Sequence, residues 1–196
     1  MKYDQLMTEL IDEYGCNEYT EAVYHLVTNW ASETLDDPFE KKPVALWWWK
    51  VKIRLATMED IDRITEMHQS YIQSWHPREY FERLVDVEEP LVLVAEQAGK
   101  IVGYSACRAE LELAHLVSMG VCPLERTKGI GSGMTLAMVV LAKERGFSAI
   151  YGHVRGSNTA ARQLYRKTGF HMEWVDEYED GDEKWEFWQS VTLEGE

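Results

Sequence analysis

A glycine-rich segment with two basic side chains, Arg126-Thr127-Lys128-Gly129-Ile130-Gly131-Ser132, has the residue types and spacing of an anion-binding loop. It follows an apolar stretch that ends at Met119-Gly120-Val121, and it leads into a helical pattern over 129–145. The first N–H groups of a helix lack intrahelical partners, and the helix dipole favours negative charge there. Glycines also let a phosphate approach the backbone closely. The segment therefore predicts a phosphate site, with Arg126 and Lys128 adding charge complementarity.

The spacing within this loop excludes two common nucleotide-binding motifs. A Walker A loop needs Gly-Lys-Ser/Thr after four intervening residues, and that sequence is absent. The dinucleotide fingerprint Gly-x-Gly-x-x-Gly is missed by one position in Gly129-x-Gly131-x-Gly133, and no early βαβ unit precedes it. The anion must therefore belong to another class of ligand.

The apolar periodicity predicts the elements that position the loop. Strands are expected over 51–56, 91–96, 101–108, 111–121, 148–154, 171–179 and 184–191. Helices are expected from Thr57, with Asp60 in a capping-box position, after Pro77, over 129–145 and over 158–168. Hairpins imply antiparallel pairs, whereas the strand–helix–strand unit 111–154 implies a parallel crossover. The predicted fold class is α/β (α+β), a central mixed sheet of about seven strands flanked by helices.

Residues 1–43 have a different pattern from the rest of the chain. Apolar residues form helical stripes in 4–14 and 20–35, and prolines break the helix at 38 and 43. The segment is too short to bury a core of its own, so we expect a helical N-terminal appendage on a main domain. Trp47-Trp48-Trp49 at the junction is expected to pack between the two, and an aromatic wall facing a substrate is the alternative.

A second motif makes the first one specific. The segment Asn158-Thr159-Ala160-Ala161-Arg162-Gln163-Leu164-Tyr165-Arg166-Lys167-Thr168-Gly169-Phe170 resembles the Asn-x-x-Ala-x-x-Leu-Tyr-x-x-x-Gly-Phe segment of the GNAT superfamily of N-acetyltransferases. Arg126-x-x-Gly129-x-Gly131 resembles the pyrophosphate-binding motif of the same family, and Val121-x-Pro123 before it fits as well. The resemblance covers residues 51–192, which we expect to form a GNAT domain, and it leaves out the appendage 1–43.

The resemblance implies acetyl-CoA as the acyl donor and primary amines as acceptors, with direct transfer in a ternary complex. Met119, Gly120 and Val121 would hold the pantetheine arm and the thioester carbonyl at a strand that splits from its neighbour. Residues 126–132 would bind the pyrophosphate, and Asn158 would contact the cofactor. Tyr165 would be the general acid for the leaving sulfur, although its place among apolar residues also fits core packing.

The general base is open between two histidines, His115 and His153. Many members of the family carry a glutamate at the first position, and NatE-type N-terminal acetyltransferases carry a histidine at the second. On strand parity, His115, Val117, Met119 and Val121 would share one face of their strand, and both imidazoles would meet in one cleft. An imidazole that titrates near neutral pH suits a general base. The alternative for each histidine is a half-buried structural role. Glu110 and Glu112 are further candidates for the base.

The composition limits the partners. A net charge of −14 argues against binding to nucleic acid or anionic membranes, and it favours a cationic partner such as an amine. Neither a signal peptide nor a membrane-spanning run is evident, so a cytoplasmic protein is expected. Cys16, Cys107 and Cys122 have no metal-ligand spacing, and the acidic run after Asp176 lacks the EF-hand pattern, so no metal is expected.

Three functions remain from the sequence. The first is an acetyltransferase for a protein N-terminus or lysine, and the second is an acetyltransferase for a small amine such as a polyamine, an amino acid or an aminoglycoside. The third is a non-catalytic domain that binds acyl-CoA for regulation. The final hairpin, with Trp185, Phe187 and Trp188, would either pair across a homodimer or pack within the sheet.

Overall fold

The computed structural model describes residues 51–72, 76–176 and 184–190. Several sequence predictions lie outside these residues: the helical appendage 1–43, the tryptophans at 47–49 and the acidic run after Asp176. Within the described part the elements follow the predicted order of strands and helices. None of the described helices is long and apolar enough to cross a bilayer.

In chain order the described elements are β1 (Val51–Leu55), η1 (Met58–Asp60), α4 (Ile61–Tyr71), α5 (Arg78–Val85), β2 (Val92–Gln97), β3 (Lys100–Glu110), β4 (Leu113–Val121), η2 (Pro123–Glu125), α6 (Ile130–Glu144), β5 (Ala149–Arg155), α7 (Thr159–Lys167), β6 (Phe170–Asp176) and β7 (Trp185–Ser190). The capping box predicted at Thr57 and Asp60 is present, and Thr57 N–H donates to the Asp60 carboxylate at 2.7 Å. Gly146 ends the α6 segment with a φ of 80°.

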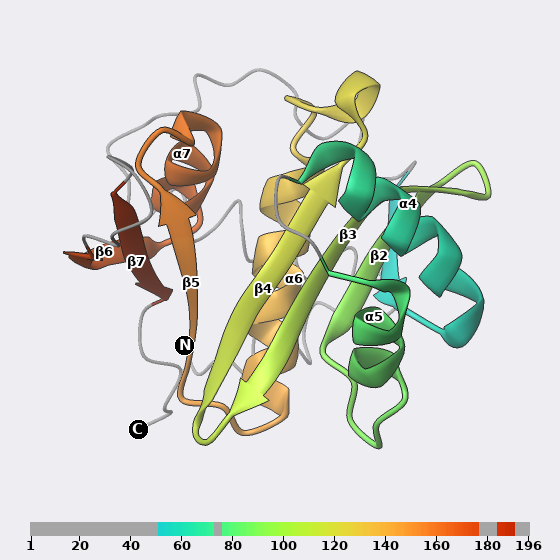
Figure 1. Ribbon diagram of the computed structural model, residues 1–196, viewed down its shortest axis with the longest axis horizontal. Coiled ribbons are helices and arrows are strands. Elements are labelled where there is room, and N and C mark those ends of the chain that lie inside the picture. Colours follow the sequence, from blue (N-terminus) through green and yellow to red (C-terminus); the bar gives the residue numbers. More distant parts are fainter. Residues whose placement is uncertain (1–50, 73–75, 177–183, 191–196) are drawn as a thin grey trace, which may run out of the picture.

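The sheet has seven strands in the order β1-β2-β3-β4-β5-β7-β6 (Figure 1). Every neighbouring pair is antiparallel except β4 and β5, which run parallel. This is the predicted mixed sheet. In Figure 1, α4 and α5 lie in front of the sheet and α6 lies behind it.

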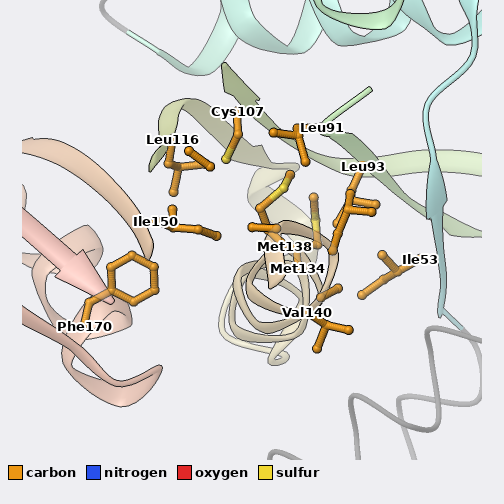
Figure 2. Packing of buried hydrophobic residues seen from close by; sticks show 14 of the residues in the cluster. Ile53, Leu91, Leu93, Cys107, Leu116, Met134, Met138, Val140, Ile150 and Phe170 are labelled. Atoms are coloured by element: carbon orange, nitrogen blue, oxygen red, sulfur yellow. The ribbon is translucent and has the colours of Figure 1, made fainter. Parts of the chain in front are cut away.

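Each face of the sheet carries its own apolar core. Behind it, α6 packs on β2–β5, and Figure 2 shows Met134 and Met138 between Leu93 on one side and Leu116 and Ile150 on the other. This core extends to Tyr165, Phe170 and Trp188 from α7, β6 and β7. In front, the apolar stripes of α4 and α5 cover Tyr104 and Ala106. Helices therefore cover both faces of the sheet.

A buried polar cluster ties α4 to the strands below it. The His68 Nδ1 atom lies 3.0 Å from both the Tyr104 hydroxyl and the Ser118 hydroxyl, and those two oxygens lie 2.7 Å apart. The His76 N–H donates to the other ring nitrogen at 3.2 Å. His68 is fully buried, so these three partners replace water around its ring.

Two strand predictions were wrong in detail. The strand expected from Leu111 begins at Leu113, because Leu111 has a φ of 55° in the β3–β4 turn and is fully exposed. More important, the alternation along β4 is broken. Ala106 pairs with Ser118 and Cys107 pairs with Leu116, so Val117 is an extra residue, a β-bulge.

The bulge changes which side chains share a face of β4. Before it, Leu116 packs in the α6 core, while Val117 packs against the α4 side. After it, the Thr135 hydroxyl of α6 donates to the Met119 sulfur at 3.6 Å, and Val121 packs against the α6 core. His115 and Val117 therefore lie opposite Met119 and Val121, and the prediction that all four share one face was wrong.

Candidate active site

The central feature of the site is the separation of β4 from β5. The two strands pair at only three positions, Leu113 with Ala149, Ala114 with Ile150, and His115 with Tyr151. Beyond His115 no described residue of β5 pairs with β4, and Figure 1 shows the strands diverging toward their C-terminal ends. Backbone groups on this edge of β4 are thus available to a ligand, as the family resemblance implied for the strand ending at Val121.

The N-terminus of α6 has the geometry of an anion site. Gly129 is its N-cap with a φ of 85°, and Thr127 before it also has a positive φ of 62°. The first helical bond runs from Gly133 N–H to the Gly129 carbonyl at 2.9 Å. The N–H groups of residues 130–132 precede that bond, so they point out of the helix end and can donate to phosphate oxygens.

The two basic residues of the loop are exposed beside this helix end. Arg126 donates from Nε to the Val121 carbonyl at 3.0 Å, and its guanidinium lies 5.7 Å from the centre of the Tyr71 ring. Lys128 forms an ion pair with Glu125 at 2.9 Å. Arg126 therefore links the loop to the end of β4 and remains exposed to solvent.

The three residues predicted to hold the pantetheine arm lie on the free part of β4. Met119 and Val121 point toward α6, as described above. Gly120 faces the Tyr104 ring, and a Cβ there would come within 2.8 Å of a ring carbon. Glycine is thus required by close packing against Tyr104, whatever the backbone at this position binds.

Tyr165 reaches from α7 into the gap between β4 and β5. Its ring stacks on Phe170 at a centroid distance of 4.8 Å, and the residue is 5% exposed. A Cβ added to Gly152 would lie 2.6 Å from the Tyr165 hydroxyl and 3.4 Å from the Leu116 carbonyl. The hydroxyl therefore sits where the strands part. Burial, with a smaller contribution from Cys107, raises the pKa of Tyr165, so the phenol keeps its proton.

The rings of the two histidines lie together, as predicted, but on the face of the sheet opposite Met119, Val121 and Tyr165. The rings of His115 and His153 lie 5.4 Å apart at 78° to each other. Tyr151 stacks on His115 at 4.5 Å, and Phe187 of β7 lies 5.1 Å from Tyr151 and 5.4 Å from His153. Burial lowers the pKa of His115, and Glu110 opposes that change, so the imidazole is neutral at physiological pH. His153 is exposed.

Glu110 is the acidic residue of this cluster. It accepts hydrogen bonds from the Tyr151 hydroxyl and from Arg108, and it lies 3.3 Å from His115 Nδ1. The hydrogen bond from Tyr151, followed by that from Arg108, lowers the pKa of Glu110 to about 2. Sequence reasoning considered Glu110 only as a further candidate for the general base, and it did not identify Tyr151 or Phe187 as site residues. Glu112, the other such candidate, is exposed in the β3–β4 turn, two residues beyond Glu110.

Asn158 has a structural contact in addition to its predicted cofactor contact. It is the N-cap of α7, and its side-chain oxygen accepts a hydrogen bond from Ala161 N–H at 3.1 Å. This bond fixes the start of the helix that carries Tyr165. Its contact with a cofactor stays a prediction.

The model of the acetyltransferase (GNAT) family matches residues 58–170, which is more than half of the chain. An N-alpha-acetyltransferase from Sulfurisphaera tokodaii is 30% identical over 132 residues, covering 61% of this chain and 79% of that protein.

Two solved structures share the fold at lower identity. The ribosomal-protein-S18-alanine N-acetyltransferase from Escherichia coli has a TM-score of 0.65 and 21% identity, covering 74% of this chain and 96% of that one. Arabidopsis thaliana Naa50 in complex with the bisubstrate analogue CoA-Ac-MVNAL has a TM-score of 0.64 and 18% identity, covering 72% of this chain and 99% of that one. The match to the family model shows that the chain belongs to the GNAT family of acetyltransferases and is an acyltransferase, and the shared fold agrees with this.

Proposed function

Because the chain is a GNAT acetyltransferase, we propose that it transfers the acetyl group of acetyl-CoA directly to the α-amine of a protein N-terminus. The observation that carries the proposal is the gap between β4 and β5. It brings the Tyr165 hydroxyl, the free edge of β4 and the His115–His153 pair to one place from opposite faces of the sheet. We further propose that residues 51–192 form the catalytic domain, with 1–43 as its helical appendage.

The donor side is assigned to α6 and β4. The N–H groups at residues 130–132, with Arg126 and Lys128, would bind the pyrophosphate of coenzyme A, since a helix N-terminus and basic side chains both complement its charge. Backbone groups of 119–121 would pair with the pantetheine arm. The positive φ values at Thr127 and Gly129 support this fit, because left-handed residues beside a helix start are typical of anion-binding turns.

The thioester supplies an activated acyl group, and the chain must manage two protons. Tyr165, which burial keeps protonated, would donate its phenolic proton to the departing sulfur. On the other face, the imidazole of His115 or of His153 would accept a proton from the acceptor ammonium, directly or through water. Holding donor and acceptor on either side of one gap makes a covalent acyl-enzyme unnecessary.

The acceptor class rests on different support. The Sulfurisphaera relative is named an N-alpha-acetyltransferase, and the Arabidopsis structure holds an analogue in which CoA is joined to a peptide. A small amine is the second candidate, favoured by the net charge of −14, which attracts polycations. Lysine side chains and binding of acyl-CoA without catalysis are further outcomes of the same experiment.

The test is release of free CoA from acetyl-CoA by the full chain. Acceptors would be peptides that differ in their first residue, the same peptides with a blocked N-terminus and one internal lysine, polyamines, amino acids and aminoglycosides. The proposal expects turnover only with free N-terminal peptides, and mass spectrometry should place the acetyl group on the α-amine. Turnover with small amines alone would overturn it. Binding of acetyl-CoA without turnover on any amine would support the non-catalytic alternative.

A further inference from the structure

The carboxylate of Glu110 joins three side chains that surround the acceptor face of the gap. One oxygen accepts from Arg108 Nε at 3.0 Å and lies 3.3 Å from His115 Nδ1, while the other accepts from the Tyr151 hydroxyl. Glu110 ends β3 and His115 lies on β4, whereas Tyr151 is on β5. The contacts therefore span three neighbouring strands at the last position where β4 and β5 pair.

Resting on the function proposed above, we infer that Glu110 is a positioning residue that holds His115 as the tautomer protonated on Nδ1. A carboxylate accepts hydrogen bonds and donates none, so the ring nitrogen facing it must carry the proton. In a neutral imidazole the other nitrogen, Nε2, then carries the free lone pair. This assigns proton acceptance from the acceptor amine to His115 Nε2, and it leaves His153 as a neighbour.

The contacts on Glu110 also fix the plane of the His115 ring. Tyr151, hydrogen-bonded to the same carboxylate, stacks on that ring at 4.5 Å and an interplanar angle of 7°. The His153 ring meets it edge-on. With one nitrogen bonded and one face covered, the imidazole has little freedom to rotate, so Nε2 keeps a constant direction.

The charge of Glu110 has a further effect on His115. The hydrogen bonds from Tyr151 and Arg108 keep the carboxylate ionised. Its negative charge raises the pKa of His115, against the lowering by burial and the smaller lowering by His153 and Arg108. These are the charged and titratable groups that face the ring from β3 and β5. Tyr151 completes the set, and its pKa is raised to about 12, so it stays neutral.

The test compares Glu110→Ala and Glu110→Gln with a matched control, Glu112→Ala, which removes the same charge from the exposed β3–β4 turn. The ¹⁵N shifts of the histidine ring nitrogens would be measured on the labelled full chain without substrates, and pH profiles of kcat would be measured with the best acceptor. In the wild type, His115 should be protonated on Nδ1 and bare on Nε2.

Glu110→Ala should move the proton of His115 toward Nε2 and lower kcat about tenfold or more, with KM for acetyl-CoA unchanged. Removing the negative charge lowers the pKa of His115, so the acidic limb of the kcat profile should move to lower pH. Glu110→Gln keeps an acceptor oxygen, so it should shift the limb while retaining more of the Nδ1–H tautomer. Glu112→Ala should change neither readout.

An unchanged tautomer in Glu110→Ala, or an acidic limb that stays in place in both Glu110 variants, would overturn the inference. A loss of activity without these two signatures would mark a structural role only. The tautomer is read without substrate, so a failure of acetyl transfer on every amine would overturn the proposed function and still leave this measurement decisive for Glu110.

Discussion

The hydroxyl of Tyr165 lies so close to Gly152 that a side chain at position 152 would occupy its place. A Cβ there would be 2.6 Å from that oxygen, a contact that real Cβ atoms do not make. Leu116 limits the same space from β4 through its carbonyl group, at 3.4 Å. The absence of a side chain on β5 is thus what admits the phenol into the gap.

The first prediction concerns this contact. Gly152→Ala should push the Tyr165 hydroxyl out of the gap, because its neighbours are packed on both sides, and should destabilise the fold by about 1–3 kcal/mol. In a Tyr165→Phe background the same change should cost clearly less, because the clashing oxygen is gone. Urea unfolding of the four chains in this cycle measures the coupling. Equal costs in both backgrounds would show that the two residues do not compete for space.

The second prediction concerns the proton that Tyr165 carries. Tyr165→Phe should lower kcat about 100-fold, the loss of a general acid, while KM for acetyl-CoA changes little. The ring and its stacking on Phe170 remain, so the free energy of unfolding should stay near that of the wild type. Steady-state kinetics with acetyl-CoA and the best peptide give the answer. A kcat within about twofold of wild type would remove Tyr165 from the mechanism.

The third prediction separates binding from folding at the helix end. A Cβ at Gly131 would make only ordinary contacts, 3.8 Å from Leu164 and 3.9 Å from Val121. Gly131→Ala should therefore fold normally and gain up to about 1 kcal/mol of stability, since alanine favours a helix. Its methyl group would hinder the approach of a phosphate, so the Kd for acetyl-CoA should rise about tenfold or more. Calorimetric titration beside urea unfolding tests both halves, and an unchanged Kd would place the pyrophosphate elsewhere.

The fourth prediction concerns how α7 is held against β7. Arg162 donates to Glu186 at 2.8 Å, and the Trp188 indole donates to the same oxygen at 2.9 Å. Glu186 is 6% exposed. Arg162→Met would therefore leave its carboxylate buried, with the Trp188 indole as the one of these two donors that remains. The expected cost is about 2–3 kcal/mol, less than for a fully buried pair because Arg162 is partly exposed.

The matched control for this pair is Arg166→Met on the same helix. Arg166 is exposed and lies 5.4 Å from the Trp188 ring centre, so its loss should cost less than about 1 kcal/mol. Thermal or urea unfolding compares the two variants. Equal costs would mean that the buried carboxylate gains nothing from Arg162.

Much of the fold was predictable because the apolar periodicity changes clearly between elements. The helix over 129–145, the start of β6 and both ends of β7 were predicted to within one residue, since glycines mark the ends of the helix and apolar residues mark its buried side. Trp188 is a core residue, so of the two alternatives for the final hairpin this side chain follows packing within the sheet. The meeting of His115 and His153 followed from simple alternation on strands that pair at that level.

The site was less predictable beyond Leu116. A bulge adds one residue without any glycine or proline to announce it, so alternation counted past Val117 gives the wrong face for Met119 and Val121. The contacts of Glu110 depend on β3, β4 and β5 coming together, and no local pattern contains that information. The start of β4 was mispredicted for another reason. Leu111 is an apolar residue of the kind found in strands, but it is exposed and has the positive φ of a turn.

The short pairing of β4 with β5, over three residue pairs, also has a consequence for motion. The strands β5, β7 and β6 are joined to the rest of the sheet by few backbone bonds, so their opening depends mainly on the side chains of Tyr165, Phe170 and Trp188 in the shared core. Acetyl-CoA bound between β4 and β5 would contact both parts of the sheet and hold them together. Acetyl-CoA should therefore slow amide hydrogen exchange in β5 and β7 more than in β2 and β3, and would give the enzyme a tighter sheet when loaded than when empty.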